Sequence, residues 1–99
     1  MKVIYLRSAL PDLAWMRRYY STVFPQGAKR AQSQLNVTKK LIAERPETGH
    51  VAVVADLLEF PVLKTPFSIV YRVRPDRIEI LRIRDQRQNP ERLRPLLRP

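Results

Sequence analysis

The spacing of apolar residues along this 99-residue chain changes at Gly49. Before Gly49, apolar residues recur at steps of three and four, which places them on one face of an α-helix. After it, short runs of β-branched and aromatic residues are separated by turns that contain proline, the pattern of β-strands. A chain of this length has room for one compact domain. The sequence therefore predicts a single α+β domain with two helices ahead of most of its strands.

The helical half begins after a short β-rich run over residues 2–7, which is expected to form a first strand. Ser8 is the expected N-cap of the first helix, with Asp12 favoured near the positive end of its dipole. Pro25 breaks the helical pattern and opens a second helix, which ends at Pro46. Because the connection between them is short, the two helices are predicted to form an antiparallel hairpin.

The second half predicts three antiparallel strands, over Leu57–Leu63, Phe67–Val73 and Ile78–Ile83. Pro61 has no N–H for a ladder, so its strand is expected to be an edge or to be bulged there. Residues 47–56 fit neither period and are expected to be a loop or irregular strand. The predicted order is β-α-α-β-β-β, with the helical hairpin on one face of a small, mostly antiparallel sheet. The predicted domain spans residues 1–87, followed by a Pro/Arg-rich tail, residues 88–99.

The chain is strongly basic. It carries 19 basic and 9 acidic side chains, a net charge of +10 with histidine neutral. Residues 68–99 contain nine arginines and no lysine. The planar guanidinium group of arginine binds phosphate or carboxylate through paired hydrogen bonds. This composition favours an ordered anion-binding surface, with nucleic acid or an acidic protein as its partner.

A set of arginines is expected on the sheet face that the helices leave free. Its members are Arg72, Arg74, Arg82, Arg84 and Arg87. Because side chains alternate along a strand, the first two point away from Ile69 and Tyr71. We predict that these arginines bind the protein's target. Charge reversal there is expected to cost little stability, since exposed ion pairs contribute only ~0–1 kcal/mol each.

Few residues suggest catalysis. The chain has no cysteine and one histidine, which excludes a disulfide framework, a thiolate nucleophile and a multi-histidine metal centre. No metal and no cofactor are expected. A lone Glu59 is interpreted as a surface charge rather than a general base, and His50 as a solvated loop residue. No apolar run reaches the ~20 residues of a membrane span, so a cytoplasmic location is expected.

Trp15 and Tyr19 lie one helical turn apart, on a face of the first helix different from that of Leu13 and Met16. Two interpretations are open. The pair could form the edge of the core, or it could bind an apolar segment of a partner protein.

Several segments match one family in order along the chain. They are Ser8–Leu13, Arg45–Gly49, Glu59–Val62, Thr65–Val73 and Ile78–Arg84. In this order they resemble the RelE/ParE superfamily of toxins from bacterial type II toxin–antitoxin systems, which serve in plasmid stabilization. The resemblance covers nearly the whole chain and implies the fold that the periodicity predicts. It also implies a cognate antitoxin that neutralises the toxin in a hetero-oligomer. From the net charge of +10 we expect this antitoxin to be acidic and to place apolar anchors at sites such as Trp15 and Tyr19.

The resemblance implies one of two activities. RelE-like members cut messenger RNA on the ribosome with basic side chains of the sheet, whereas ParE-like members inhibit DNA gyrase. The ribonuclease branch often has arginine immediately before Ile-Val-Tyr, where this chain has Ser68. No tyrosine follows Tyr71, and the histidine that many relatives place after the last strand aligns with Arg84.

We therefore prefer a ParE-like toxin that inhibits DNA gyrase and lacks enzyme activity. The alternative is a RelE-like, ribosome-dependent endoribonuclease. A basic nucleic-acid-binding module without a toxin role is a third interpretation. Relatives commonly carry arginine where this chain has Leu58, a difference that would weaken toxicity if that arginine serves it.

Overall fold

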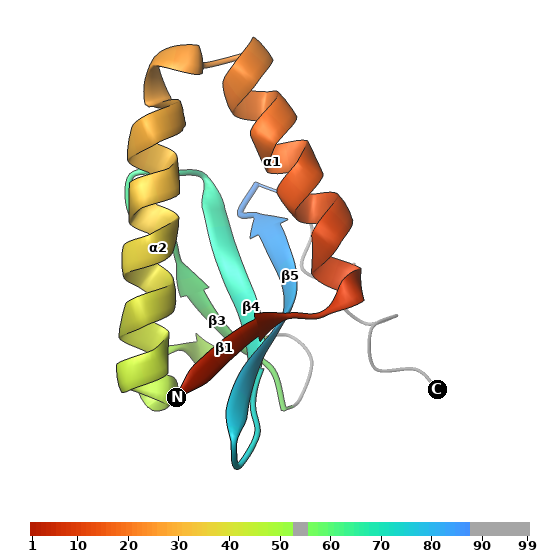
Figure 1. Ribbon diagram of the computed structural model, residues 1–99, viewed down its shortest axis with the longest axis vertical. Coiled ribbons are helices and arrows are strands. Elements are labelled where there is room, and N and C mark those ends of the chain that lie inside the picture. Colours follow the sequence, from red (N-terminus) through yellow and green to blue (C-terminus); the bar gives the residue numbers. More distant parts are fainter. Residues whose placement is uncertain (53–55, 88–99) are drawn as a thin grey trace.

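The fold is a helical hairpin on a five-stranded sheet. A computed structural model describes residues 1–52 and 56–87. The helices and strands, in chain order, are β1 (Lys2–Tyr5), α1 (Leu10–Thr22), α2 (Ala28–Glu44), β2 (His50–Val51), β3 (Leu58–Pro61), β4 (Phe67–Val73) and β5 (Arg77–Asp85). The strand order is β1-β5-β4-β3-β2, with β1 parallel to β5 and the other neighbours antiparallel (Figure 1). The predicted α+β class and element order are confirmed. The predicted tail lies outside the described residues.

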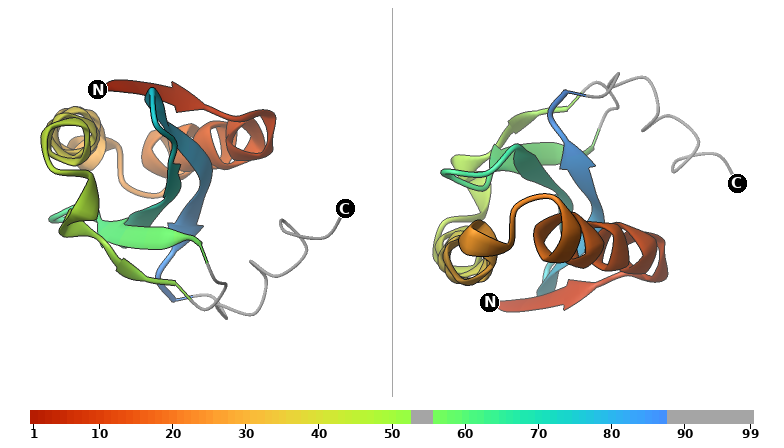
Figure 2. Two further views of the ribbon diagram at one scale, coloured as in Figure 1. Left: turned by 90° about the horizontal axis from the view of Figure 1, so that it is seen from below. Right: turned by 90° about the horizontal axis from the view of Figure 1, so that it is seen from above.

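The two helices run antiparallel and side by side against the sheet (Figures 1 and 2). A short 3-10 turn, Pro25–Gly27, joins them, so α2 begins three residues after the proline that was expected to open it. The main core joins apolar side chains of both helices to one face of β4 and β5. Its largest members are Met16, Tyr20, Leu35, Ile42, Phe67, Ile69, Tyr71, Ile78, Ile80 and Ile83. Burial of these side chains is the main favourable term that holds the hairpin on the sheet.

The second face of the sheet is partly covered, although the sequence predicted it to be free. Val70, between two residues of the main core, points to this face, where it packs with Leu81, Leu57 and Ala52. Leu6 packs against the same small cluster. Ala52 and Leu57 therefore cover part of the face on which the arginines were expected.

The sheet is irregular at β5, not at Pro61. Val70 pairs with Arg82 while the next residue of β4, Tyr71, pairs with Ile80, so Leu81 is an extra residue in β5. Pro61 pairs with Ser68 in a regular register. Strand β3 is not an edge strand as predicted, because β2 pairs with its first two residues. Pro61 lies beyond these two pairs, where its missing N–H interrupts no ladder to β2.

Ser8 does not cap α1 as the sequence predicted. Its hydroxyl group donates instead to the carbonyl oxygen of Leu81, at 2.6 Å, and α1 begins at Leu10 with no side-chain cap. Asp12 accepts a hydrogen bond from the backbone N–H of Ile83, at 2.9 Å. The pairs of β1 with β5 end at Ile80, so these two side chains bind backbone groups of β5 just beyond the reach of β1.

Candidate functional site

The five predicted target-binding arginines are held by four different carboxylates. Each arginine makes an ion pair with a carboxylate, and the arginines fall into groups according to the carboxylate that they bind. Arg72 and Arg74 pair with Glu79, Arg82 with Asp12, Arg84 with Glu59 and Arg87 with Asp85. The ion pairs of Arg82 and Arg84 join residues that are far apart in the sequence. The alternation of side chains along one strand could not predict them.

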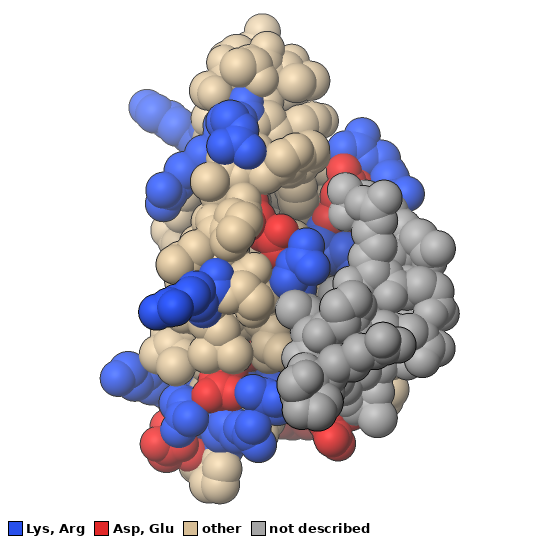
Figure 3. Space-filling model, turned by 90° about the vertical axis from the view of Figure 1, so that its right-hand side faces the viewer, with Lys and Arg blue, Asp and Glu red and all other residues tan. Residues whose placement is uncertain are grey.

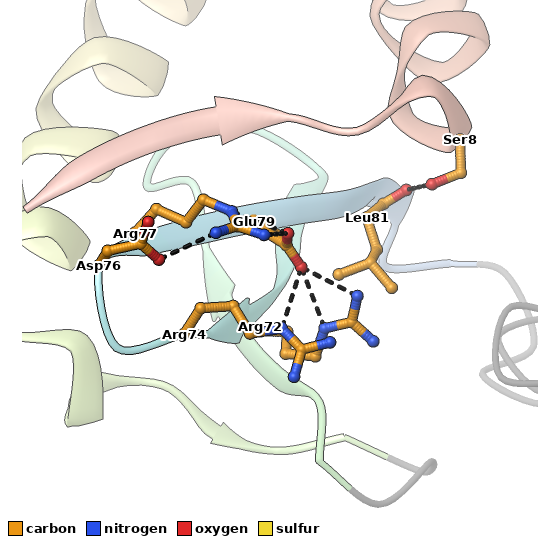
Figure 4. Close-up of polar contacts among 7 residues, drawn as sticks. All are labelled: Ser8, Arg72, Arg74, Asp76, Arg77, Glu79 and Leu81. Carbon is orange, nitrogen blue, oxygen red and sulfur yellow. Dashed lines mark hydrogen bonds and ion pairs between the residues drawn. The ribbon is translucent and has the colours of Figure 1, made fainter.

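The first group lies at the β4–β5 hairpin and is named the hairpin cluster, defined as Arg72, Arg74, Arg77 and Glu79 (Figure 4). One oxygen of Glu79 accepts from Arg72 Nη2 at 2.9 Å and from Arg74 Nε at 3.4 Å. The other oxygen accepts from Arg77 Nε at 3.0 Å. Glu79 is buried while the arginine side chains are partly exposed. One carboxylate thus holds three guanidinium groups, of which sequence reasoning overlooked that of Arg77.

The second group is named the inner cluster, defined as Glu59, Ser68 and Arg84. Arg84 Nε donates to Glu59 Oε2 at 2.8 Å, and the Ser68 hydroxyl donates to the same oxygen. The side chains of Arg84 and Glu59 are only 13% and 6% exposed. The interpretation of Glu59 as a surface charge is therefore wrong, and so is that of Arg84 as an exposed one.

His50 is brought beside the inner cluster, since it is the register partner of Glu59 in the β2–β3 pair. The two residues line a cleft of about 300 Å³ together with Ser68, Arg84 and Gln86. His50 is exposed, as expected, but it lies in a strand and not in a loop. This grouping of histidine, glutamate, serine and arginine could not be predicted from any local motif.

Arg82 binds the first turn of α1. Its Nε and Nη2 atoms donate to the two carboxylate oxygens of Asp12, at 2.6 and 3.0 Å. The hydrogen bonds with Asp12 raise the pKa of Arg82, which stays positively charged. With the Ile83 N–H also bound to Asp12, this ion pair joins α1 to β5 and is not a free surface charge.

Trp15 and Tyr19 stack on each other, with ring centres 5.7 Å apart. Both rings also make edge contacts with Phe67. Tyr19 packs against the main core, and the guanidinium carbon of Arg87 lies 5.9 Å from the centre of its ring. Trp15 remains 40% exposed. Tyr19 thus belongs to the edge of the core, and Trp15 leaves an exposed aromatic surface, while binding of a partner at this pair stays a prediction.

Acid sensitivity is expected from two buried carboxylates. The hydrogen bonds from Arg87 lower the pKa of Asp85, and the hydrogen bond from Arg72 is the main cause that lowers the pKa of Glu79. Such groups stabilise the fold above their unfolded pKa, about 4, and this stabilisation is lost as pH falls through the folded pKa. We expect the urea midpoint to be level above about pH 5 and to fall below about pH 4. Asp85→Asn should flatten this fall, and an unchanged pH profile would show that the Asp85 pair contributes nothing.

Comparison with known proteins places the chain in a family. A family model described as ParE toxin of type II toxin-antitoxin system, parDE, matches residues 3–90. A solved structure of the chromosomal ParDE TA system from P. aeruginosa is similar, with 25% identity and a TM-score of 0.69. The match covers 86% of this chain and 95% of that chain. Among curated proteins nothing matches significantly. In residues 1–52 and 56–87, no helix is long and apolar enough to cross a membrane. This chain belongs to the ParE toxin family of type II toxin–antitoxin systems.

Proposed function

We propose that this toxin inhibits DNA gyrase and is neutralised by a cognate acidic antitoxin. The family match over residues 3–90 is the observation that carries the proposal, because gyrase inhibition is what the resemblance to ParE-like toxins implies. The solved relative is named as a ParDE system, which supports an antitoxin partner for this chain. The net charge of +10 suits a partner with acidic side chains.

The inner cluster argues against Glu59 as the general base of an RNA-cleaving site. Cleavage by 2′-hydroxyl attack needs a general base within reach of the proton that it removes. Glu59 and His50 lie together, but Glu59 is buried and one of its oxygens already accepts hydrogen bonds from Ser68 and Arg84. A carboxylate held in this way serves as the anion of a structural ion pair and is not available to remove a proton from RNA. We therefore keep the endoribonuclease as the alternative and gyrase inhibition as the proposal.

Induction of the toxin in cells tests this choice. The expected result is that DNA supercoiling changes and the DNA-damage response begins before protein synthesis falls. Plasmid topology, a damage reporter and pulse labelling of new protein would be followed from the time of induction. Co-expression of the neighbouring reading frame, as the candidate antitoxin, is the control and should suppress all three changes. Early translation arrest with cleaved messages would instead favour the endoribonuclease.

The antitoxin is expected to use Trp15 as an anchor. Buried tryptophan anchors often carry much of the binding energy, so Trp15→Ala should weaken antitoxin binding by at least about tenfold. Val37→Ala is the matched control, because Val37 is an exposed apolar residue of the other helix, 57% exposed against 40% for Trp15. Titration calorimetry with the purified pair measures both. Equal affinities for the wild type and Trp15→Ala would remove Trp15 from the antitoxin site.

A further inference from the structure

The β4 side of the β4–β5 hairpin extends beyond β3, and the turn of the hairpin lies beyond the first pair of β1 with β5. The β3 pairs with β4 end at Tyr71, so Arg72 and Val73 continue past β3. On the other side, β1 begins at Lys2, which pairs with Arg77. Figure 1 shows the turn of this hairpin projecting from the lower end of the molecule. Basic side chains gather at the same end in Figure 3, with acidic ones among them.

Three arginines stand against two carboxylates at this projecting end, a surplus of one positive charge, and Asp56 lines a cleft beside Arg72 and Arg74. The arginines of the hairpin cluster face the carboxylates of Glu79 and Asp76, and Arg77 is shared between those two. The side chains of Arg74 and Arg77 remain 44% and 38% exposed. Within the described part of the chain, Arg74 donates a side-chain hydrogen bond only through Nε, which leaves its terminal amino groups for a ligand.

Because Glu79 holds the guanidinium groups, they need little further ordering when an anion binds. Arginine side chains lose considerable rotamer freedom when they are immobilised, and prior ordering reduces that loss. The carboxylate is buried and its pKa is lowered by the hydrogen bond from Arg72, so it remains an anion near neutral pH. The arrangement is therefore prepared for a ligand with several negative charges.

We propose that the hairpin cluster binds the phosphodiester backbone of duplex DNA. Arginine binds phosphate through paired hydrogen bonds, and a two-stranded β-ribbon fits the major groove. The turn itself exposes Pro75 and Asp76 and has no aromatic residue, whereas protein interfaces usually centre on buried aromatic or aliphatic anchors. The projecting shape and the lack of an aromatic residue in the turn thus favour DNA over an acidic protein. The inference deepens the proposed function, because gyrase acts on duplex DNA.

Fluorescence anisotropy with a labelled 20-base-pair duplex and the purified full-length toxin tests the inference. Arg74→Gln/Arg77→Gln is expected to weaken binding by about tenfold or more and to reduce the salt slope by about two. The matched control is Lys29→Gln/Arg30→Gln, which removes the same charge from two exposed residues of α2. The control should change the affinity by less than about threefold, since only long-range attraction is reduced. Circular dichroism would confirm that both variants are folded.

Three results would overturn the inference. The first is equal weakening by the two double variants, which would leave net charge as the only cause. The second is no binding of the duplex at 50 mM salt. The third is tight binding of a polyglutamate peptide without binding of DNA, which would assign the cluster to an acidic protein.

The inference and the proposed function can fail separately. If the Arg74/Arg77 variant binds DNA normally while the wild type inhibits gyrase, the inference fails and the proposed function stands. If the wild type binds DNA through these two arginines but does not inhibit gyrase, the inference stands and the proposed function fails.

Discussion

Replacing Arg84 by alanine is expected to lower the free energy of unfolding by about 3–5 kcal/mol, because removing one partner of a buried ion pair leaves the other charge unpaired. The partner left behind is Glu59, whose side chain is 6% exposed and which is bound otherwise to Ser68. Urea denaturation at neutral pH measures the effect. The sequence predicted that charge changes at Arg84 would cost little stability. The structure instead predicts a large loss of stability.

Arg74→Ala is the matched control for Arg84. It removes the same side chain from the turn that follows β4, at a position 44% exposed, so we expect a loss of at most about 1 kcal/mol. Adding Glu59→Gln to Arg84→Ala should restore part of the stability, since the buried negative charge then disappears. Equal losses for the two single variants would mean that the inner cluster is not buried in solution.

Gly49→Ala is expected to destabilise the protein by about 1–3 kcal/mol or more, the usual cost of overpacking a core. A Cβ atom at this position would lie 2.5 Å from the hydroxyl oxygen of Tyr71 and 3.0 Å from its ring. Tyr71 is fully buried and cannot move aside, because its hydroxyl group donates to the Pro46 carbonyl oxygen at 2.7 Å and accepts from the Gly49 N–H at 2.9 Å. Thermal and urea unfolding measure the loss.

Gly27→Ala is the comparison for Gly49→Ala. An added Cβ there would also be too close to the ring of Phe24, but Phe24 is 50% exposed and can turn toward solvent. The buried ring of Tyr20, 3.3 Å from the added Cβ, would have to give by only a few tenths of an ångström. We expect at most a small loss of stability. Tyr71→Phe tests the hydrogen bonds separately and should cost about 1–3 kcal/mol through the unsatisfied groups of Pro46 and Gly49. A stable Gly49→Ala protein would show that the turn after α2 can shift away from β4.

The sequence predicted the fold well because the fold follows from spacing along the chain. The steps of three and four that include Met16 and Leu35 locate the helices, and both residues are buried in the main core. Predictions from neighbouring residues were wrong where a residue far along the chain binds the same side chain. Ser8 suits a helix N-cap, yet its hydroxyl group donates to the Leu81 carbonyl oxygen of β5, 73 residues away along the chain, whereas Asp12 lies in the first turn of α1 as expected.

The candidate site was less predictable, because its ion pairs join distant residues. Glu59 has its partners at Ser68 and Arg84, 9 and 25 residues further along, and only the register of three strands brings them together. The extra residue Leu81 shifts the alternation of side chains along β5 by one position. A prediction that assumes strict alternation does not include such a shift. Arg77 was overlooked because it stands in a turn signal, although Glu79 lies only two residues away.

Gyrase inhibition is tested most directly with purified components. The toxin is added to DNA gyrase and relaxed plasmid in the presence of ATP, and supercoiled product is measured on a gel, with the toxin–antitoxin complex as the control. We expect the free toxin to abolish supercoiling at a small molar excess over gyrase and the complex to leave it unchanged. Full supercoiling in the presence of free, folded toxin, together with cleavage of messenger RNA on purified ribosomes, would contradict the proposed function.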